Sequence, residues 1–488
     1  MKRLLPIVLI SSFISFVICL VFTDRVSDGF FAVTFYPIVY CICFFTLYHY
    51  AKDKNVGGRI TACIYLSLQW LRLVLLPALG SISGYFDESL IYISQQTAEI
   101  AAWLLVWEAA ATTVVVCIIL RYSPQKQRLE VEKEYSLFGN SWIYTVFIFA
   151  AFVLYLLRGR GMYTLLRLNL DSTRASQQES DSTSLILSSV IGFGLSFFVI
   201  NSLYFLYRRY NWTKKKKYFV IAIAIAILRI LIISTSSESR FSVVYSMGSL
   251  LLLLPLLFPE KKRPIYRNVL IAAIAVIGLM TVYKVFRAFL YGSYTEAFRI
   301  GADRFDLEMA SSQIDVYFYG VRNVAKNIAI SQNIELTTST FLNDIVRNTF
   351  GVNFFIGDIN DTTILKYNMY IYGGKAAAGH LYSSASYGYV FFGFVLAPVA
   401  TSINLLLCSW TEKLLSRIRY IDIFYVLSAI FVRFCVSMFA CFSFAWNYIS
   451  RTFVIGAIII GGAAIFTKRY RINYHSTTKT NTLISDKE

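Results

Sequence analysis

Several basic residues lie inside or at the ends of long apolar runs, where charged side chains are rare. The set is Arg72, Arg229, Arg240, Lys284, Arg287, Arg433 and Arg451. A charge at membrane depth costs at least ~2.5 kcal/mol, so an ionisable residue in such a run indicates a functional site. The acids in comparable positions are fewer: Glu99, Glu108 and Glu238. Because arginine stays charged when desolvated and binds phosphate oxygens in pairs, the surplus predicts a ligand with phosphate or carboxylate groups.

A simpler interpretation applies to each of these residues singly: it pairs with an acid or extends to the membrane surface. Arg72 and Arg433 lie deep in their runs and could pair with Glu108. Lys284 and Arg287 are three residues apart, so they share one helix face. We expect the anion to be bound mainly by Arg229, Arg240, Lys284 and Arg287, and in second place by Arg72, Arg433 and Arg451.

His380 is the candidate general base. It lies in Gly379-His-Leu-Tyr382, just before an apolar run, and an unperturbed histidine titrates near neutral pH. A histidine with a structural hydrogen bond is the alternative, and Glu238 is a second candidate base. The sequence has no Walker lysine motif, HExxH motif or Cys/His cluster, so we predict neither a metal site nor a cofactor.

The elements that carry these residues are apolar segments. The 488 residues are 57% hydrophobic and only 15% charged, which predicts an all-α polytopic membrane protein. We expect about twelve transmembrane helices. The spans are predicted at roughly 4–22, 30–50, 60–80, 97–120, 141–157, 184–207, 218–234, 241–258, 268–290, 384–408, 421–443 and 446–467.

Lysine and arginine cluster in alternate connections, as in Lys214-Lys-Lys-Lys217, so both termini are predicted on the cytoplasmic side. This alternation also explains the net charge of +18 without a nucleic-acid partner. The first apolar run lacks a small-residue cleavage site, so it is interpreted as an uncleaved span.

One long polar segment interrupts the apolar pattern and is predicted as a large, partly helical outer loop. Within it, Phe341, Ile345 and Phe350 repeat at helical spacing, which suits an amphipathic helix on the membrane surface. The predicted organisation is a bundle of about nine spans over 1–290, the outer loop over 291–383, about three spans over 384–467 and a cytoplasmic tail over 468–488.

Two short stretches resemble the Wzy-type polymerases that join O-antigen or capsule repeat units in the bacterial inner membrane. Ser236-Ser-Glu-Ser-Arg240 at the start of a span is similar to a Ser-Arg signature of these enzymes. Gly379-His380 leading into Tyr387-Gly388 and Gly393 is similar to the stretch that follows their large loop. The acid or amide often found in that stretch is replaced here by Ser384 and Ser386.

The resemblance implies a glycosyltransferase that joins undecaprenyl-diphosphate-linked oligosaccharides on the outer face of the bacterial inner membrane. It implies that Arg240 and Arg287 stabilise the departing diphosphate, that His380 or Glu238 acts as base, and that the other basic residues bind the diphosphate. A flippase and a chain-length regulator are the expected protein partners.

Three alternatives remain. A lipid-linked oligosaccharide flippase also has about twelve spans, but usually has short loops and two similar halves. Another lipid-sugar glycosyltransferase would often carry catalytic acids in a large first outer loop, whereas the loop at 23–29 is short. An ion-coupled transporter is disfavoured because the embedded charges are mainly cationic.

Overall fold

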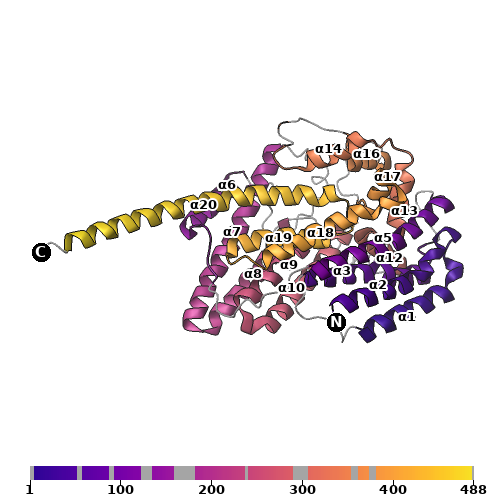
Figure 1. Cartoon of the computed structure of the whole chain (residues 1–488), viewed down its shortest axis with the longest axis horizontal. Helices are drawn as coiled ribbons and strands as arrows, with labels where there is room; N and C mark the ends of the chain where they lie inside the picture. The colour runs from indigo at the N-terminus through magenta and orange to yellow at the C-terminus, as the bar shows by residue number, and fades with distance from the viewer. Residues whose placement is uncertain are drawn as a thin grey trace. The chain divides into compact units, whose positions relative to one another are not determined.

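The computed structural model describes the backbone of 5–51, 58–86, 93–122, 135–158, 182–236, 240–288, 306–352, 355, 361–372 and 381–485. Within these ranges the chain is helical, and extended pairing is limited to two isolated bridges, Ser136–Tyr420 and Ser383–Ala440 (Figure 1). The prediction of an all-α protein is confirmed for this part of the chain.

Five helices are long and apolar enough to cross a membrane, or up to seven when each of two bent helix pairs counts as one span. This indicates a membrane protein, while the count of about twelve spans stays a prediction. The five are Asp28–Tyr50, Arg59–Ser83, Gln95–Tyr122, Ile186–Thr213 and Ala445–Ile465. Two shorter apolar helices, Leu5–Val21 and Ser141–Leu157, coincide with predicted spans.

The chain forms two compact units that cut across the predicted division into bundle, loop and tail. Unit 1 comprises Met1–Leu129, Thr295–Ser416 and Arg433–Ser450. Unit 2 comprises Glu130–Tyr294, Arg417–Val432 and Arg451–Glu488. The division into units does not test where the chain leaves the membrane. The boundaries predicted at 290, 383 and 467 therefore stay predictions.

The apolar helices of unit 1 include one local irregularity. Between α3 (Arg59–Trp70) and α4 (Leu76–Ser83) the segment Leu71–Leu75 is a π-helix, in which Leu76 N donates to the carbonyl of Leu71. Pro77 follows and has no N–H to donate to the carbonyl four residues earlier, which favours the wider turn. The other apolar helices at this end of the chain are α1 (Leu5–Val21), α2 (Tyr36–Ala51) and α5 (Gln95–Tyr122).

Part of the predicted outer loop is built into unit 1. It forms α12 (Leu307–Phe318), α13 (Val321–Ser331), α14 (Thr338–Asn348) and α16 (Thr363–Tyr372). Helix α12 packs on α4, and α13 packs on α5. The prediction of helices in this segment is confirmed, but α13 is buried on nearly all sides, with Val324 and Ile328 fully inaccessible.

The helix predicted around Phe341 exists as α14. At Phe341 its apolar side packs against another helix of the protein, whereas the sequence predicted contact with the membrane surface. The Phe341 ring centroid lies 5.9 Å from that of Tyr387 and 5.4 Å from that of Phe391. Both partners belong to α17 (Ser384–Leu396). Other large apolar side chains nearby stay exposed, including Leu342 and Phe355.

The span predicted over 384–408 is not one continuous helix, and whether the bent pair counts as one span stays a prediction. The segment bends by 111° between Ser384–Leu396 and Pro398–Leu415, the latter being α18. Gly393 has a φ of +76°, which ends regular helix geometry, and Pro398 opens α18. The two halves pack so closely that a Cβ at Gly388 would overlap the carbonyl oxygen of Ala397.

Gly388→Ala is therefore expected to destabilise the protein by about 1–3 kcal/mol, because the added methyl group has no space beside Ala397. Thermal unfolding of the detergent-solubilised protein measures the loss. Gly278→Ala is the matched control, since a Cβ there meets nothing within 4 Å. Equal melting temperatures for the two variants would contradict the close approach.

Unit 2 consists mainly of long helices in sequence order. They are α6 (Ser141–Arg158), α7 (Ser182–Thr213), α8 (Lys216–Ser236), α9 (Arg240–Leu257) and α10 (Lys262–Ala288). Two later helices, α19 (Ile421–Val436) and α20 (Phe442–Ser485), each belong in part to both units. Within unit 2, the buried carboxylate of Asp422 accepts hydrogen bonds from Phe138 N, Gly139 N and the Tyr144 hydroxyl, which fastens the start of α19 to the start of α6.

Candidate anion-binding site

Each of the helices α7 to α10 of unit 2 packs against the next one in sequence, and α8 also packs against α10. Two residues connect α7 to α8, and the chain turns by 119° between Phe241–Leu257 and Pro259–Gly278. Short connections join antiparallel neighbours. The short connection makes α7 and α8 antiparallel neighbours, so the C-terminal part of α8 lies beside the N-terminal part of α7.

Arg229 is a buried cation in this C-terminal part of α8. Its side chain is 9% exposed, and one terminal nitrogen donates to the Ser196 hydroxyl of α7 at 3.0 Å. Its Nε has no acceptor, and none of the described carboxylates forms an ion pair with it. A buried charge is normally compensated by an opposite charge. Arg229 is thus a candidate position for binding an anion.

Arg451 contacts the same face of α7. Its guanidinium donates to the Ser189 hydroxyl at 3.5 Å. Ser189 and Ser196 are seven residues apart, which places them about 10 Å apart along one side of the helix. Ser196 donates its own proton to the carbonyl of Gly192, so its oxygen is oriented to accept from Arg229. Two hydroxyls of one helix therefore position two of the predicted arginines.

Three further predicted residues lie at helix ends within the same unit. Arg240 is the first residue of α9, and Lys284 and Arg287 lie near the last turn of α10. The side chains of these three lie outside the part of the chain that the structure describes. The candidate bases Glu238 and His380 lie outside the described residues altogether.

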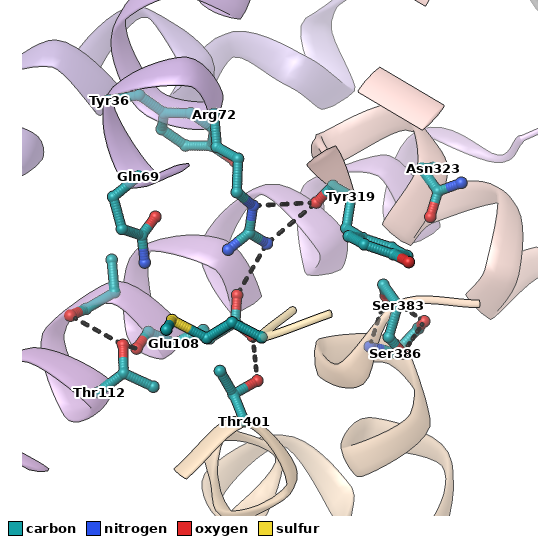
Figure 2. Close-up of polar contacts among 12 residues, drawn as sticks. Tyr36, Gln69, Arg72, Glu108, Thr112, Tyr319, Asn323, Ser383, Ser386 and Thr401 are labelled. Carbon is teal, nitrogen blue, oxygen red and sulfur yellow. Dashed lines mark hydrogen bonds and ion pairs between the residues drawn. The ribbon is translucent and has the colours of Figure 1, made fainter. Parts of the chain in front are cut away.

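Arg72 is compensated within unit 1 instead. Its side chain is 1% exposed, one terminal nitrogen lies 2.8 Å from Oε2 of Glu108, and the guanidinium also donates to the Tyr319 carbonyl at 2.9 and 3.1 Å (Figure 2). Its guanidinium carbon stands 4.0 Å from the centre of the Phe439 ring. Glu108 also accepts a hydrogen bond from Thr401 of α18. The internal pairing considered for Arg72 is what the structure shows, so its assignment to an external anion is not retained.

Arg433, the other second-choice residue in unit 1, also lies against protein. Its side chain is 9% exposed, and its guanidinium carbon is 5.2 Å from the centre of the Tyr448 ring. Its role as a second-choice ligand for the anion stays a prediction.

A buried polar cluster surrounds the segment that carries the family resemblance, and sequence reasoning missed it. Ser383 caps α17 by accepting from Ser386 N, and Ser386 Oγ accepts from the Asn327 amide of α13 at 3.2 Å. Asn327 in turn accepts from the Tyr367 hydroxyl of α16 at 2.6 Å. The asparagines at 323 and 327 within an apolar helix pattern were the available signal. The cluster fixes the start of α17 to α13 and α16.

Asp344 of α14 forms the second half of this cluster. It is 1% exposed and accepts from Thr363 N at 2.9 Å, the Thr363 hydroxyl at 2.6 Å and the Tyr387 hydroxyl at 3.0 Å. Desolvation by burial raises the pKa of this carboxyl above its ordinary value, although the three donors oppose the shift. The arrangement joins α14, α16 and α17.

Asp315, at the end of α12, is expected to make stability depend on pH. Burial raises the pKa of this carboxyl to about 7. The carboxylate accepts hydrogen bonds from the backbone N–H groups of Arg322 and Asn323, which lower the pKa but do not cancel the effect of burial. Between pH 4 and 7 the folded protein keeps a proton that the unfolded chain releases, so the free energy of unfolding falls as the pH rises, by at most about 4 kcal/mol. Melting temperatures between pH 5 and 8 measure this, and Asp315→Asn is expected to flatten the slope. An unchanged slope in that variant would contradict the assignment.

Comparison with protein-family models, with curated proteins and with solved structures finds no match. Fold and site define the described part of the chain as an α-helical protein with five to seven candidate spans and a buried arginine, Arg229, that pairs with no described carboxylate.

Proposed function

We propose that this protein is a polysaccharide polymerase that joins lipid-diphosphate-linked oligosaccharide repeat units on the outer face of the bacterial inner membrane. The observation that carries the proposal is Arg229, a buried guanidinium whose described partner is a neutral serine. A diphosphate would supply the missing negative charge, and guanidinium groups bind phosphate oxygens in pairs.

The proposed reaction needs no ATP and no metal. A hydroxyl oxygen of the acceptor sugar attacks the anomeric carbon of the donor, the bond from that carbon to the diphosphate oxygen breaks, and the lipid diphosphate leaves. His380 takes the hydroxyl proton in this proposal, with Glu238 as the substitute base. The leaving diphosphate supplies the driving force for transfer.

In this proposal the basic residues of unit 2 stabilise the charge that develops on the diphosphate. Fixed donors aimed at developing charge are typically worth 10²- to 10³-fold each in rate, about 2.7–4 kcal/mol. Arg229 and Arg451 are oriented by the serines of α7. Arg240, Lys284 and Arg287 complete the proposed set from the ends of α9 and α10.

The proposed setting is a multi-pass protein with both termini in the cytoplasm, acting beside a flippase that delivers the substrate and a chain-length regulator. The product would be O-antigen of a lipopolysaccharide or a capsule.

Reconstitution tests the proposal. Purified protein in liposomes is mixed with lipid-diphosphate-linked repeat units extracted from its own host, in the presence of EDTA and without ATP. The expected result is a ladder of joined repeat units together with released lipid diphosphate. Movement of the substrate across the bilayer without any ladder would replace the polymerase with a flippase.

A further inference from the structure

A groove lies between the end of α13 and the second half of α17, within unit 1. Its volume is about 520 Å³, in the range of small-molecule sites. One wall carries the polar side chains of Ser331 and Gln332, and the other carries Tyr389 and Phe394. Gly393 lies between these two aromatic residues with a φ of +76°, and a Cβ there would meet nothing within 4 Å.

The chemistry of the lining selects against a charged ligand. None of the described residues that line the groove carries a formal charge. A hydroxyl, a carboxamide and a phenol offer neutral hydrogen-bond donors and acceptors, while aromatic faces offer flat apolar surface. A sugar ring presents the same combination, with hydroxyls at its edge and C–H groups on its faces.

The groove adjoins a surface suited to lipid. Val395 and Leu396, directly after the groove residues of α17, are 70% and 55% exposed. The stripe continues along α18 through Val399, Ile403, Leu406 and Trp410, which are 42–59% exposed and spaced three or four residues apart. An amphiphile with its apolar chain along this stripe would place its polar part at the groove.

We propose that this groove binds the uncharged sugar residues of a lipid-linked oligosaccharide, with the lipid lying along the exposed face of α18. The inference rests on the proposed function for the identity of the lipid-linked substrate. Gln332 and Tyr389 are the binding residues, and Gly393 keeps the floor open for the ring. The groove is distinct from the arginine site of unit 2, because its lining suits sugars and not phosphate.

The test is direct binding, which does not depend on turnover. The probe is the free oligosaccharide repeat unit, released by mild acid from its lipid diphosphate and titrated into full-length protein in nanodiscs by calorimetry. Loss of one good hydrogen bond or ring contact is worth about tenfold in affinity. Gln332→Ala and Tyr389→Ala are each expected to raise Kd about tenfold. Tyr389→Phe, which keeps the ring, is expected to weaken binding less.

The control is a variant outside the groove. The exposed α14 variant Leu342→Ala is expected to bind the probe as the unsubstituted protein does. Unchanged Kd values for Gln332→Ala and Tyr389→Ala, or no binding by the unsubstituted protein, would overturn the groove assignment even if polymerisation is observed. If the probe binds in a way that depends on Gln332 but the protein polymerises nothing, the groove assignment would be supported and the proposed function would be contradicted.

Discussion

Arg72→Ala is expected to abolish the folding of unit 1, with little protein recovered as a monodisperse species in detergent. The change leaves Glu108 as an uncompensated charge that is 1% exposed, which typically costs 3–5 kcal/mol. It also removes the donors to the Tyr319 carbonyl and the cation that stacks on Phe439. Fluorescence-detected size exclusion of membrane extracts measures the loss.

A second substitution distinguishes lost pairing from lost volume. Arg72→Met combined with Glu108→Leu removes both charges and keeps apolar bulk, and such replacements of buried pairs are often neutral. We expect the double variant to be recovered better than Arg72→Ala. A stable, monodisperse Arg72→Ala protein would show that the pair does not hold unit 1 together.

Arg229→Ala is expected to have the opposite profile: normal folding and no polymer. Removing a buried cation that has no acidic partner among the described residues takes away a desolvation cost, so the melting temperature should be unchanged or higher. Loss of its charge from the proposed site should slow transfer by about 10²- to 10³-fold. Complementation of a deletion strain, followed by a gel of the surface glycan, measures polymer length.

Three variants make this result specific. Ser196→Ala removes the hydroxyl that orients Arg229, and a partial shortening of the ladder is expected. Arg229→Lys keeps the charge without the paired donors, so it should restore part of the activity. Arg267→Ala alters an exposed arginine near the start of α10 and should leave the ladder intact. A full ladder from Arg229→Ala at normal protein levels would remove this arginine from the reaction.

Hydrophobic periodicity accounts for most of what the sequence could predict about the fold. Apolar runs located α5 and the first helices correctly, because length and composition decide whether a helix can be buried or span a membrane. The break in the run at 384–408 was missed, since Gly393 and Pro398 read as tolerated residues within an apolar stretch. The packing of α13 on α5 was also missed, because the residue pattern within one helix gives no information about which distant helix covers it.

The sequence could predict that buried arginines mark the candidate site, but it could identify only some of the residues that belong to it. Buried charge alone singled out both Arg72 and Arg229, since the sequence cannot show which cation has an acid beside it. Tertiary structure separates them, with Glu108 at 2.8 Å from Arg72 and Ser196 at 3.0 Å from Arg229. The serines at 189 and 196 gave a weak signal, a seven-residue spacing on one side of an apolar helix.

The most direct test of the central claim is a gel of the surface glycan from a strain that lacks this protein. The account predicts a lipid core that carries a single repeat unit, with the ladder of longer chains gone and restored by the unsubstituted gene. Loss of all repeat units, or an unchanged ladder, would contradict a polymerase.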